Sequence, residues 1–491
     1  MKKMKRRDFL KVSGLSAAVM SLESTSIASG NFKKPPNIIF IILDELGYFE
    51  LSCMGNKKLR TPNIDRMAKE GIQFTQALAG APVCAPTRST LMTGQHTGHT
   101  TVRANSGELA LRKDDITIAE VLKKAGYVTG GFGKWGIGDR GTTGAPELQG
   151  FDEFYGYYHQ VHAHSYFPNY LVHNGNKVAL EGNTGDFYKG KQFAHNLIFE
   201  KTKDFIRKNK DDQFFCYCPW TPPHGLWGFP EDDPEWQKYK NKPWTAGEKT
   251  SNDAKVYAAM IAMVDRQVGE IFQLLKEEGL DENTIVFFCG DNGGQDYFKN
   301  GDPAKPDVDK NKFPGGFFGP NTNPITGERF RGGKRELYEG GLRVPMIVRW
   351  PGKIQPGRKS DLLWYFPDIM PTLAEIVQAK LPADIDGISI VPSLLNAKPD
   401  GSKQKKHEYL YWEFNGQTAI RIDNWKGVKK SKDAMFELYN LNNDIEEKNN
   451  VAKSHMDIIA RMEKYTLEAH EKNITGSWLD KSKRFKGHQE R

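Results

Sequence analysis

The apolar positions of the chain fall into two alternating patterns. Short continuous runs of β-branched and aromatic residues are typical of strands buried on both faces of a parallel sheet. Between them lie amphipathic segments with helical spacing, some of which start at Thr or end at Gly. The expected strands are 37–43, 213–220, 284–290, 344–350 and one that ends at Lys134, and the expected helices include 61–71, 116–126, 195–209 and 255–279. This alternation predicts an α/β fold with a doubly wound, mostly parallel sheet.

The pattern changes near residue 400, where the stretch AKPDGSKQKK is polar and highly charged. Beyond it, YLYWEF, TAIRIDNWKGVKK and AMFELYNL are typical of antiparallel strands, and an amphipathic segment over 455–473 predicts a closing helix. Residues 300–333, rich in Gly, Pro, Asn and Asp, are expected to form a long loop. We therefore expect a catalytic domain over 35–400 and a small α+β domain, an antiparallel sheet plus a helix, over 401–482.

The first 30 residues have the composition of an export signal. The sequence KRRDFLK is followed by a mildly apolar run and small residues as far as Gly30. This order is typical of a twin-arginine signal, although a basic amphipathic helix has a similar start. The apolar run is too short to span a bilayer, and no other stretch is a transmembrane candidate. We therefore expect a signal peptide over 1–30, export by the twin-arginine machinery, and a periplasmic or secreted protein.

The charge of the chain changes this picture little. A hydrophobic content of 38% and a charged content of 26% describe a soluble globular protein. Half of the net charge of +8 lies in the first 29 residues, which hold six Lys or Arg against two Asp or Glu. The remainder is mildly basic, which suits an anionic substrate without requiring one. No basic array interleaved with aromatic residues indicates nucleic-acid binding.

Acidic, amide and basic side chains stand at the ends of the expected strands. In open α/β folds ligands bind beyond the carboxyl ends of the parallel strands, so we expect these side chains around one site. Four of them carry hard oxygen donors, which Ca²⁺ prefers, and no Cys or His that would favour zinc stands among these four. The expected Ca²⁺ ligands are Asp44, Glu45, Asp291 and Asn292, and the expected basic neighbours are Lys134 and His224.

The stretch VCAPTRSTLMTG carries the candidate nucleophile. Pro86 suits the first turn of a helix, so we expect Cys84 at the helix N-terminus, in a field that favours anions. Arg88, one turn further on, faces the same way and adds a positive charge. From these residues alone, a buried thiol at the start of a helix explains the pattern equally well.

The pattern C-x-P-x-R followed by L-x-T-G resembles that of the formylglycine-dependent sulfatases, arylsulfatase-like members of the alkaline phosphatase superfamily. The resemblance runs through almost the whole chain after residue 36. It implies that a separate maturation enzyme oxidises Cys84 to formylglycine before folding, that the hydrated aldehyde attacks sulfur, and that Arg88 orients the hydrate. Lys134 in GFGKWGIG and Lys334 in FRGGKRELYEGG match the sulfate-binding lysines of the family. His224 in TPPHGLW matches the histidine that protonates the departing alcohol.

The chain departs from the family pattern at two positions. Glu45 stands where a second aspartate is usual, so the same charge is carried by a longer side chain. Gly136 stands where the family has a histidine that contacts the hydrate. We expect His164 or His162, from the segment HQVHAHSYFP, to take that place or to bind substrate. These two and the neighbouring His159 are equally explained as loop histidines without a role.

Together these features predict a sulfuric ester hydrolase that removes sulfate from a sulfated carbohydrate, with galactose-type units as the favoured substrate. Two alternatives stay open. A phosphoester or phosphonate hydrolase on the same fold would bind a tetrahedral group of the same shape and different charge, although the pair Asp291-Asn292 differs from the Asp-His pair typical of the two-zinc phosphatases. A sulfoglycan-binding protein with a decayed site would explain Gly136.

Overall fold

Seven buried residues, NIIFIIL, form the central strand β1 of the large sheet. Its alternate side chains enter two separate hydrophobic cores, one on each face of the sheet. The computed structural model describes residues 34–105, 109–305, 312–395 and 403–472. Within them the sheet has ten strands in the order β11-β2-β10-β9-β1-β8-β4-β5-β6-β7. The bounds are β1 Asn37–Leu43, β2 Ile72–Phe74, β4 Val128–Lys134, β5 Glu153–Tyr157, β6 Tyr170–His173, β7 Asn176–Ala179, β8 Phe214–Trp220, β9 Thr284–Gly290, β10 Met346–Arg349 and β11 Arg358–Ser360.

The middle of the sheet is parallel. Strands β9, β1, β8, β4 and β5 run in one direction, so their carboxyl ends form one edge. β10 pairs antiparallel with β9 and β2, and β6 and β7 continue the other side as antiparallel strands. A short pair of β3 and β12 lies apart from this sheet.

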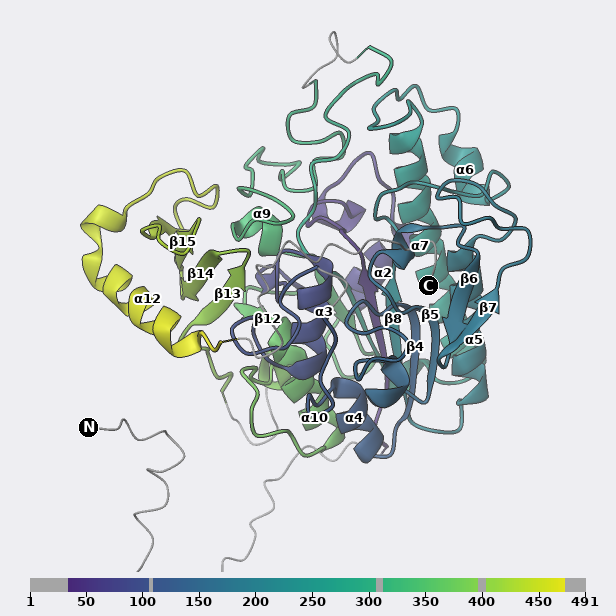
Figure 1. Ribbon diagram of the computed structural model, residues 1–491, viewed down its shortest axis with the longest axis horizontal. Helices are drawn as coiled ribbons and strands as arrows, with labels where there is room; N and C mark the ends of the chain where they lie inside the picture. The colour runs from purple at the N-terminus through teal and green to yellow at the C-terminus, as the bar shows by residue number, and fades with distance from the viewer. Residues whose placement is uncertain (1–33, 106–108, 306–311, 396–402, 473–491) are drawn as a thin grey trace, which may run out of the picture.

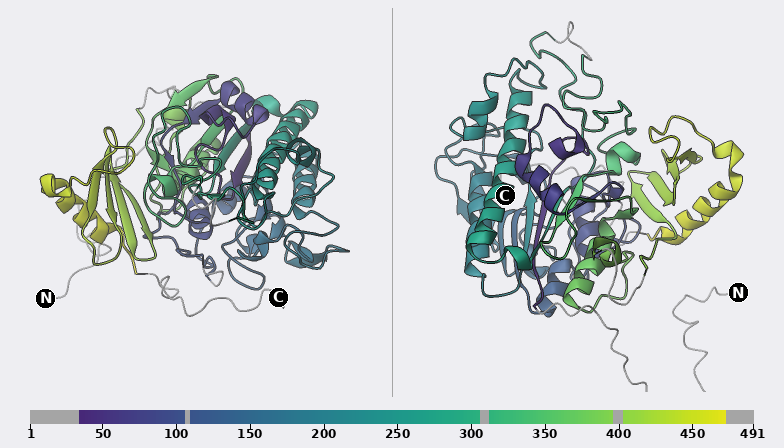
Figure 2. Two further views of the ribbon diagram at one scale, coloured as in Figure 1. Left: turned by 90° about the horizontal axis from the view of Figure 1, so that it is seen from above. Right: turned by 180° about the vertical axis from the view of Figure 1, so that it is seen from behind.

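Helices cover both faces of the sheet (Figures 1 and 2). One layer packs on Ile39, Ile41 and Leu43, and the other packs on Ile38 and Phe40. The first layer contains α2 Pro62–Glu70, α5 Ala194–Lys208 and α7 Asp253–Glu277, and the second contains α3 Cys84–Thr93, α4 Ile118–Lys124 and α10 Ile369–Val377. Shorter elements are β3 Ala77–Leu78, β12 Trp364–Tyr365, α6 Pro234–Tyr239, α9 Glu339–Leu342 and α11 Val391–Leu395. Two layers of helices around a largely parallel sheet confirm the predicted doubly wound α/β class.

A four-stranded antiparallel sheet and a final helix follow in the C-terminal part (Figure 1). They are β13 Leu410–Phe414, β14 Gln417–Ile422, β15 Trp425–Lys429, β16 Glu437–Asn440 and α12 Met456–Ala469. One face of this sheet packs on α12, and the other packs on residues that lead into α3 and α9. The Trp412 indole donates to the Ala79 carbonyl at 2.8 Å, and buried Lys426 pairs with buried Glu339 at 2.9 Å. The small sheet is therefore bonded to the segments that carry the site.

Some features of the sheet differ from what the apolar runs alone convey. The strand expected over 344–350 is present as β10 but runs antiparallel, because a long loop rather than a crossover helix connects it to β9. Strands β5 to β7 are short, and Glu, Gly, His, Asn and Lys interrupt their apolar residues, so no continuous apolar run marks them. The predicted signal peptide and most of the polar stretch near residue 400 lie outside the described residues. Among the described residues, no helix has both the length and the apolar character to cross a membrane.

Candidate active site

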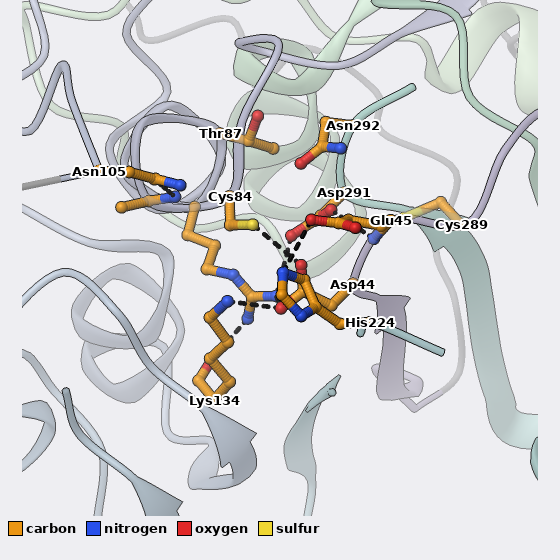
Figure 3. Close-up of polar contacts among 12 residues, drawn as sticks. Asp44, Glu45, Cys84, Thr87, Asn105, Lys134, His224, Cys289, Asp291 and Asn292 are labelled. Carbon is orange, nitrogen blue, oxygen red and sulfur yellow. Dashed lines mark hydrogen bonds and ion pairs between the residues drawn. The ribbon is translucent and has the colours of Figure 1, made fainter. Parts of the chain in front are cut away.

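The carboxyl edge of the parallel strands brings the predicted site residues together (Figure 3). Asp44 follows β1, Asp291 follows β9, and Lys134 is the last residue of β4. His224 stands in the turn after β8, where its backbone N–H donates to the Thr221 carbonyl at 3.0 Å. These polar side chains at the strand ends therefore lie around one site, as predicted.

Cys84 is the first residue of α3 and is fully buried. Its thiol donates to Asp44 Oδ1 at 2.9 Å. The helix starts here because Val83 is extended and the Asn105 side chain accepts from the Ala85 N–H at 2.8 Å. Burial, with the charges of the neighbouring aspartates, raises the pKa of Cys84 well above its ordinary value. An unmodified thiol at this position is therefore poorly suited to act as a nucleophile, because the thiolate is the reactive form.

Arg88 is the cation that links three parts of the site. The side chain is fully buried, and its guanidinium donates to Asp291 Oδ2 at 3.0 Å and to the Lys134 carbonyl at 2.5 Å. The Asp44 carboxylate lies 3.7 Å from the same guanidinium. Because its described contacts go to these buried groups, Arg88 fixes the geometry of the acidic cluster and balances its charge.

Two aspartates of the acidic cluster respond differently to burial. Burial raises the pKa of Asp44, but the charges of Lys134, His224 and Arg88 outweigh it and hold that pKa well below the ordinary value. Lys134 Nζ lies 2.5 Å from Asp44 Oδ2. Burial and the charge of Asp44 raise the pKa of Asp291 to about 7, although Arg88 opposes them. The pair therefore competes for the same cations when no metal ion is present.

Glu45 joins the acidic cluster to the predicted proton donor. Its backbone N–H donates to Asp291 Oδ1 at 3.0 Å, and its Oε1 lies 2.7 Å from His224 Nε2. Lys334 forms an ion pair with the same carboxylate, and its Nζ lies 3.3 Å from His224 Nε2. Burial lowers the pKa of Lys334 to about 8 and also lowers the pKa of His224. Glu45 has φ +68°, a region that few non-glycine residues adopt.

The Lys334 loop is held close to the strand end by paired glycines. Gly293 donates to the Gly341 carbonyl at 2.9 Å, and a Cβ on Gly293 would lie 1.9 Å from the Gly340 carbonyl oxygen. No residue with a side chain fits there without movement of the backbone. The contact between Gly293 and Gly341 holds the loop that carries Lys334 against the end of β9. Lys334 thereby lies beside His224, which is 110 positions earlier in the chain.

The donor set at this edge fits a hard divalent cation. It offers three carboxylates and one amide oxygen, and Asn292 Oδ1 is buried without a hydrogen-bond partner. A buried amide oxygen left unpartnered beside carboxylates is the arrangement that Ca²⁺ or Mg²⁺ completes. The candidate ligands are Asp44, Glu45, Asp291 and Asn292, as predicted from the sequence.

The predicted histidines of the 159–164 segment occupy different places. The His164 ring stacks on the His224 ring, with centroids 4.2 Å apart and 12° between the planes. The His162 ring contacts Tyr170 and Tyr157, with centroid distances of 4.4 and 5.2 Å. Both roles assigned to these histidines stay predictions.

Sequence reasoning missed the side chains that orient the predicted ones. Tyr166 donates its hydroxyl to the His224 carbonyl at 2.8 Å, and Tyr297 donates to the Glu45 carboxylate. Gln160 is buried next to Gly136 and Arg88. Gln160 and Tyr166 stand in the segment HQVHAHSYFP, but no metal-ligand or nucleophile spacing marks any of the three residues, so the fold is needed to show these contacts.

This edge combines a buried acidic cluster, three cations and a histidine at the ends of parallel strands. The arrangement defines a class of hydrolases that act on esters of tetrahedral anions such as sulfate or phosphate. The model of the Sulfatase family matches residues 36–379, and that of the C-terminal region of N-sulphoglucosamine sulphohydrolase matches residues 327–472. The chain belongs to the sulfatase family, and it is a sulfatase, an enzyme that hydrolyses sulfate esters.

Individual relatives agree with this assignment. The chain is 30% identical to an N-acetylgalactosamine-6-O-sulfatase of Bacteroides thetaiotaomicron, over 88% of this chain and 93% of the relative. The crystal structure of Ps i-CgsB in complex with k-i-k-neocarrahexaose is similar, with a TM-score of 0.71 and 28% identity over 90% of this chain and 94% of that one. A phosphonate monoester hydrolase of Agrobacterium radiobacter shares the fold at 20% identity, with a TM-score of 0.61 over 88% of this chain and 95% of that one.

Proposed function

We propose that this sulfatase removes sulfate from a sulfated carbohydrate with galactose-type units, and that it works with Ca²⁺ and a formylglycine at position 84. The name of the N-acetylgalactosamine-6-O-sulfatase and the neocarrahexaose bound to the solved relative support a saccharide substrate. The twin-arginine pattern of residues 1–30 supports action in the periplasm or outside the cell.

The charges of the site support an anionic substrate. Three buried carboxylates face three cations, so a bound divalent cation would leave the site with a net positive charge. The cations are Arg88, Lys134 and Lys334, and the carboxylates are Asp44, Glu45 and Asp291. A Ca²⁺ ion held by these carboxylates and Asn292 would supply Lewis acidity toward the bound anion.

The remaining steps belong to side chains of this chain. Lys134 and Lys334 bind and orient the sulfuryl group as point charges, and Arg88 holds the acidic cluster in place. His224 holds a proton at Nε2, which lies 2.7 Å from the acceptor Glu45 Oε1, and donates it to the departing alcohol oxygen. A formylglycine hydrate at position 84 would supply the hydroxyl that attacks sulfur as the bond to the alcohol breaks. Loss of the proton of its second hydroxyl would then release sulfate and restore the aldehyde.

The observation that carries the proposal is the state of Cys84. The thiol is fully buried, bonded to an aspartate and has a raised pKa, so it is unsuited to direct attack. A maturation enzyme cannot reach it in the folded chain. We therefore infer that a separate enzyme oxidises Cys84 before folding and before export of the folded protein.

Mass spectrometry of the Cys84 peptide from active protein tests the proposal. We expect the mass of formylglycine, and we expect Cys84→Ala to abolish turnover of an arylsulfate while the protein still folds. A screen of defined sulfated saccharides should then identify galactose-type substrates. An unmodified cysteine in fully active enzyme would contradict the proposal, and saccharide binding without turnover would favour the decayed binding protein.

The fold shared with the phosphonate monoester hydrolase motivates one further candidate, a phosphoester or phosphonate hydrolase. The same preparation should be assayed with an arylsulfate, an arylphosphate and an aryl phosphonate at equal concentrations. We expect the sulfate ester to be hydrolysed fastest, because the chain belongs to the sulfatase family over residues 36–379. A higher kcat/KM for either phosphorus ester would favour the other candidate.

A further inference from the structure

The backbone at Gly136 leaves a space that another side chain fills. Gly136 has φ +80°, and a Cβ built on it would lie 2.7 Å from Gln160 Oε1 and 3.6 Å from Arg88 Cδ. Gln160 therefore occupies the position into which a side chain at residue 136 would project. The Gln160 amide oxygen and the aliphatic part of Arg88 thus both lie within 4 Å of the same point, and Arg88 is one helical turn from Cys84 along α3.

The Gln160 segment is tied to Gly136 by the backbone. Trp135 donates its N–H to the Tyr157 carbonyl at 2.8 Å, and Gly136 donates to the Tyr158 carbonyl at 3.0 Å. These bonds extend the pairing of β4 with β5 beyond the strand ends, so the backbone holds the Gln160 segment at a fixed distance from Gly136.

Two polar atoms around this point have no hydrogen-bond partner. Gln160 is only 3% exposed, and its Oε1 is a buried acceptor without a donor. Arg88 is fully buried, and its Nε has no acceptor within hydrogen-bond distance, although the guanidinium also interacts with the Tyr217 hydroxyl. Buried polar atoms are rarely left unpaired, and a hydroxyl group can both donate to an amide oxygen and accept from a guanidinium N–H.

We propose that Gln160 Oε1 and Arg88 Nε together bind a hydroxyl of the hydrate at position 84, in place of a side chain at residue 136. This inference rests on the proposed formylglycine. Gln160 is then a contact of the reacting group that orients the hydroxyl. A neutral amide accepts a hydrogen bond but does not take up a proton, so it cannot serve as a general base.

Gln160→Ala tests this role with two readouts. We expect kcat for an arylsulfate to fall about 10- to 100-fold with KM changed less than about threefold, as for loss of an orienting partner. Loss of the hydrogen bond also favours the free aldehyde over its hydrate. The folded Gln160→Ala variant should therefore react several-fold faster than the wild type with a hydroxylamine probe.

Gln149→Ala is the matched control, because Gln149 is equally buried and its Oε1 also lacks a hydrogen-bond partner. Its amide N–H donates to the Arg112 and Thr143 carbonyls, none of which belongs to the site. We expect this variant to lower thermal stability without changing kcat or the probe reaction. If Gln160→Ala has only that effect, Gln160 is a packing residue and the inference is wrong.

Gly136→Ala gives an independent test that leaves Gln160 in the chain. The new Cβ would displace the Gln160 amide, so the variant should reproduce the changes in kcat and probe reaction. Adding it to Gln160→Ala should change little more, because the displaced group is already absent. Additive effects of the two changes would contradict the inference. The formylglycine content of every variant should be measured by mass spectrometry. Unmodified Cys84 in active enzyme would refute the proposed formylglycine itself, whereas additive effects in formylglycine-containing protein would refute only the role of Gln160.

Discussion

Replacing Arg88 by methionine tests whether this guanidinium holds the acidic cluster together. Methionine keeps much of the volume and removes the charge that faces Asp291 at 3.0 Å and Asp44 at 3.7 Å. Arg88 also belongs to the C-x-P-x-R pattern, so the comparison is made in a Cys84→Ala background, where maturation plays no part. A chelator keeps the protein free of metal.

The expected loss follows from the burial of both partners. Removing one partner of a buried ion pair costs about 3–5 kcal/mol. For a folded unit of about 400 residues this corresponds to a fall of ~4–6 °C in the melting temperature. The pKa of Asp291 is already raised to about 7, and loss of Arg88 raises it further. A carboxyl with a raised folded-state pKa contributes stability that is lost as the pH rises through that pKa, so the destabilisation should be larger at pH 8 than at pH 6.

Thermal unfolding at pH 6 and pH 8 measures both effects. We expect the double variant Arg88→Met/Asp291→Asn to recover part of the stability, because it removes both buried charges instead of one. An equal loss at the two pH values, or a double variant as unstable as the sum of the single variants, would refute the reasoning. Either result would mean that Asp291 does not depend on Arg88 for its counter-charge.

Three further predictions concern other residues. Burial lowers the pKa of His195 to about 4, so the melting temperature should fall as the pH drops from about 6.5 towards 4. The variant His195→Gln should flatten this pH dependence, and an unchanged slope would exclude His195 as its cause. Metal analysis and kinetics should show that Asp291→Ala loses bound metal and turnover together, and retained metal in this variant would place the metal site elsewhere. Glu45→Asp should have a smaller effect on both, because it keeps the charge and aspartate tolerates φ +68° better. His164→Ala should lower kcat if the ring stacked on His224 has a catalytic role, whereas a higher KM with kcat intact would show that it only binds substrate.

The sequence predicted well those features that repeat along the chain or stand at strand ends. The buried runs of β1, β8 and β9 and the side chains that follow them were found because burial on both faces leaves a continuous apolar signal. Lys334 could be assigned only by resemblance, because its position depends on contacts between distant glycine-rich loops. Gln160 carries no group that titrates and belongs to no known motif, and only the conformation of the backbone at Gly136 shows that its side chain fills the space.

The bonds between the small C-terminal sheet and the site also bear on the timing of synthesis. Glu339, just beyond the Lys334 loop, finds its buried partner Lys426 only after another 87 residues have been added to the nascent chain. About 340 residues separate Cys84 from that partner, and a ribosome adds them in roughly 20–70 s. During this interval the site is incomplete and the Cys84 segment has not received its final packing. The late arrival of the small sheet thus sets the time available to the proposed maturation enzyme.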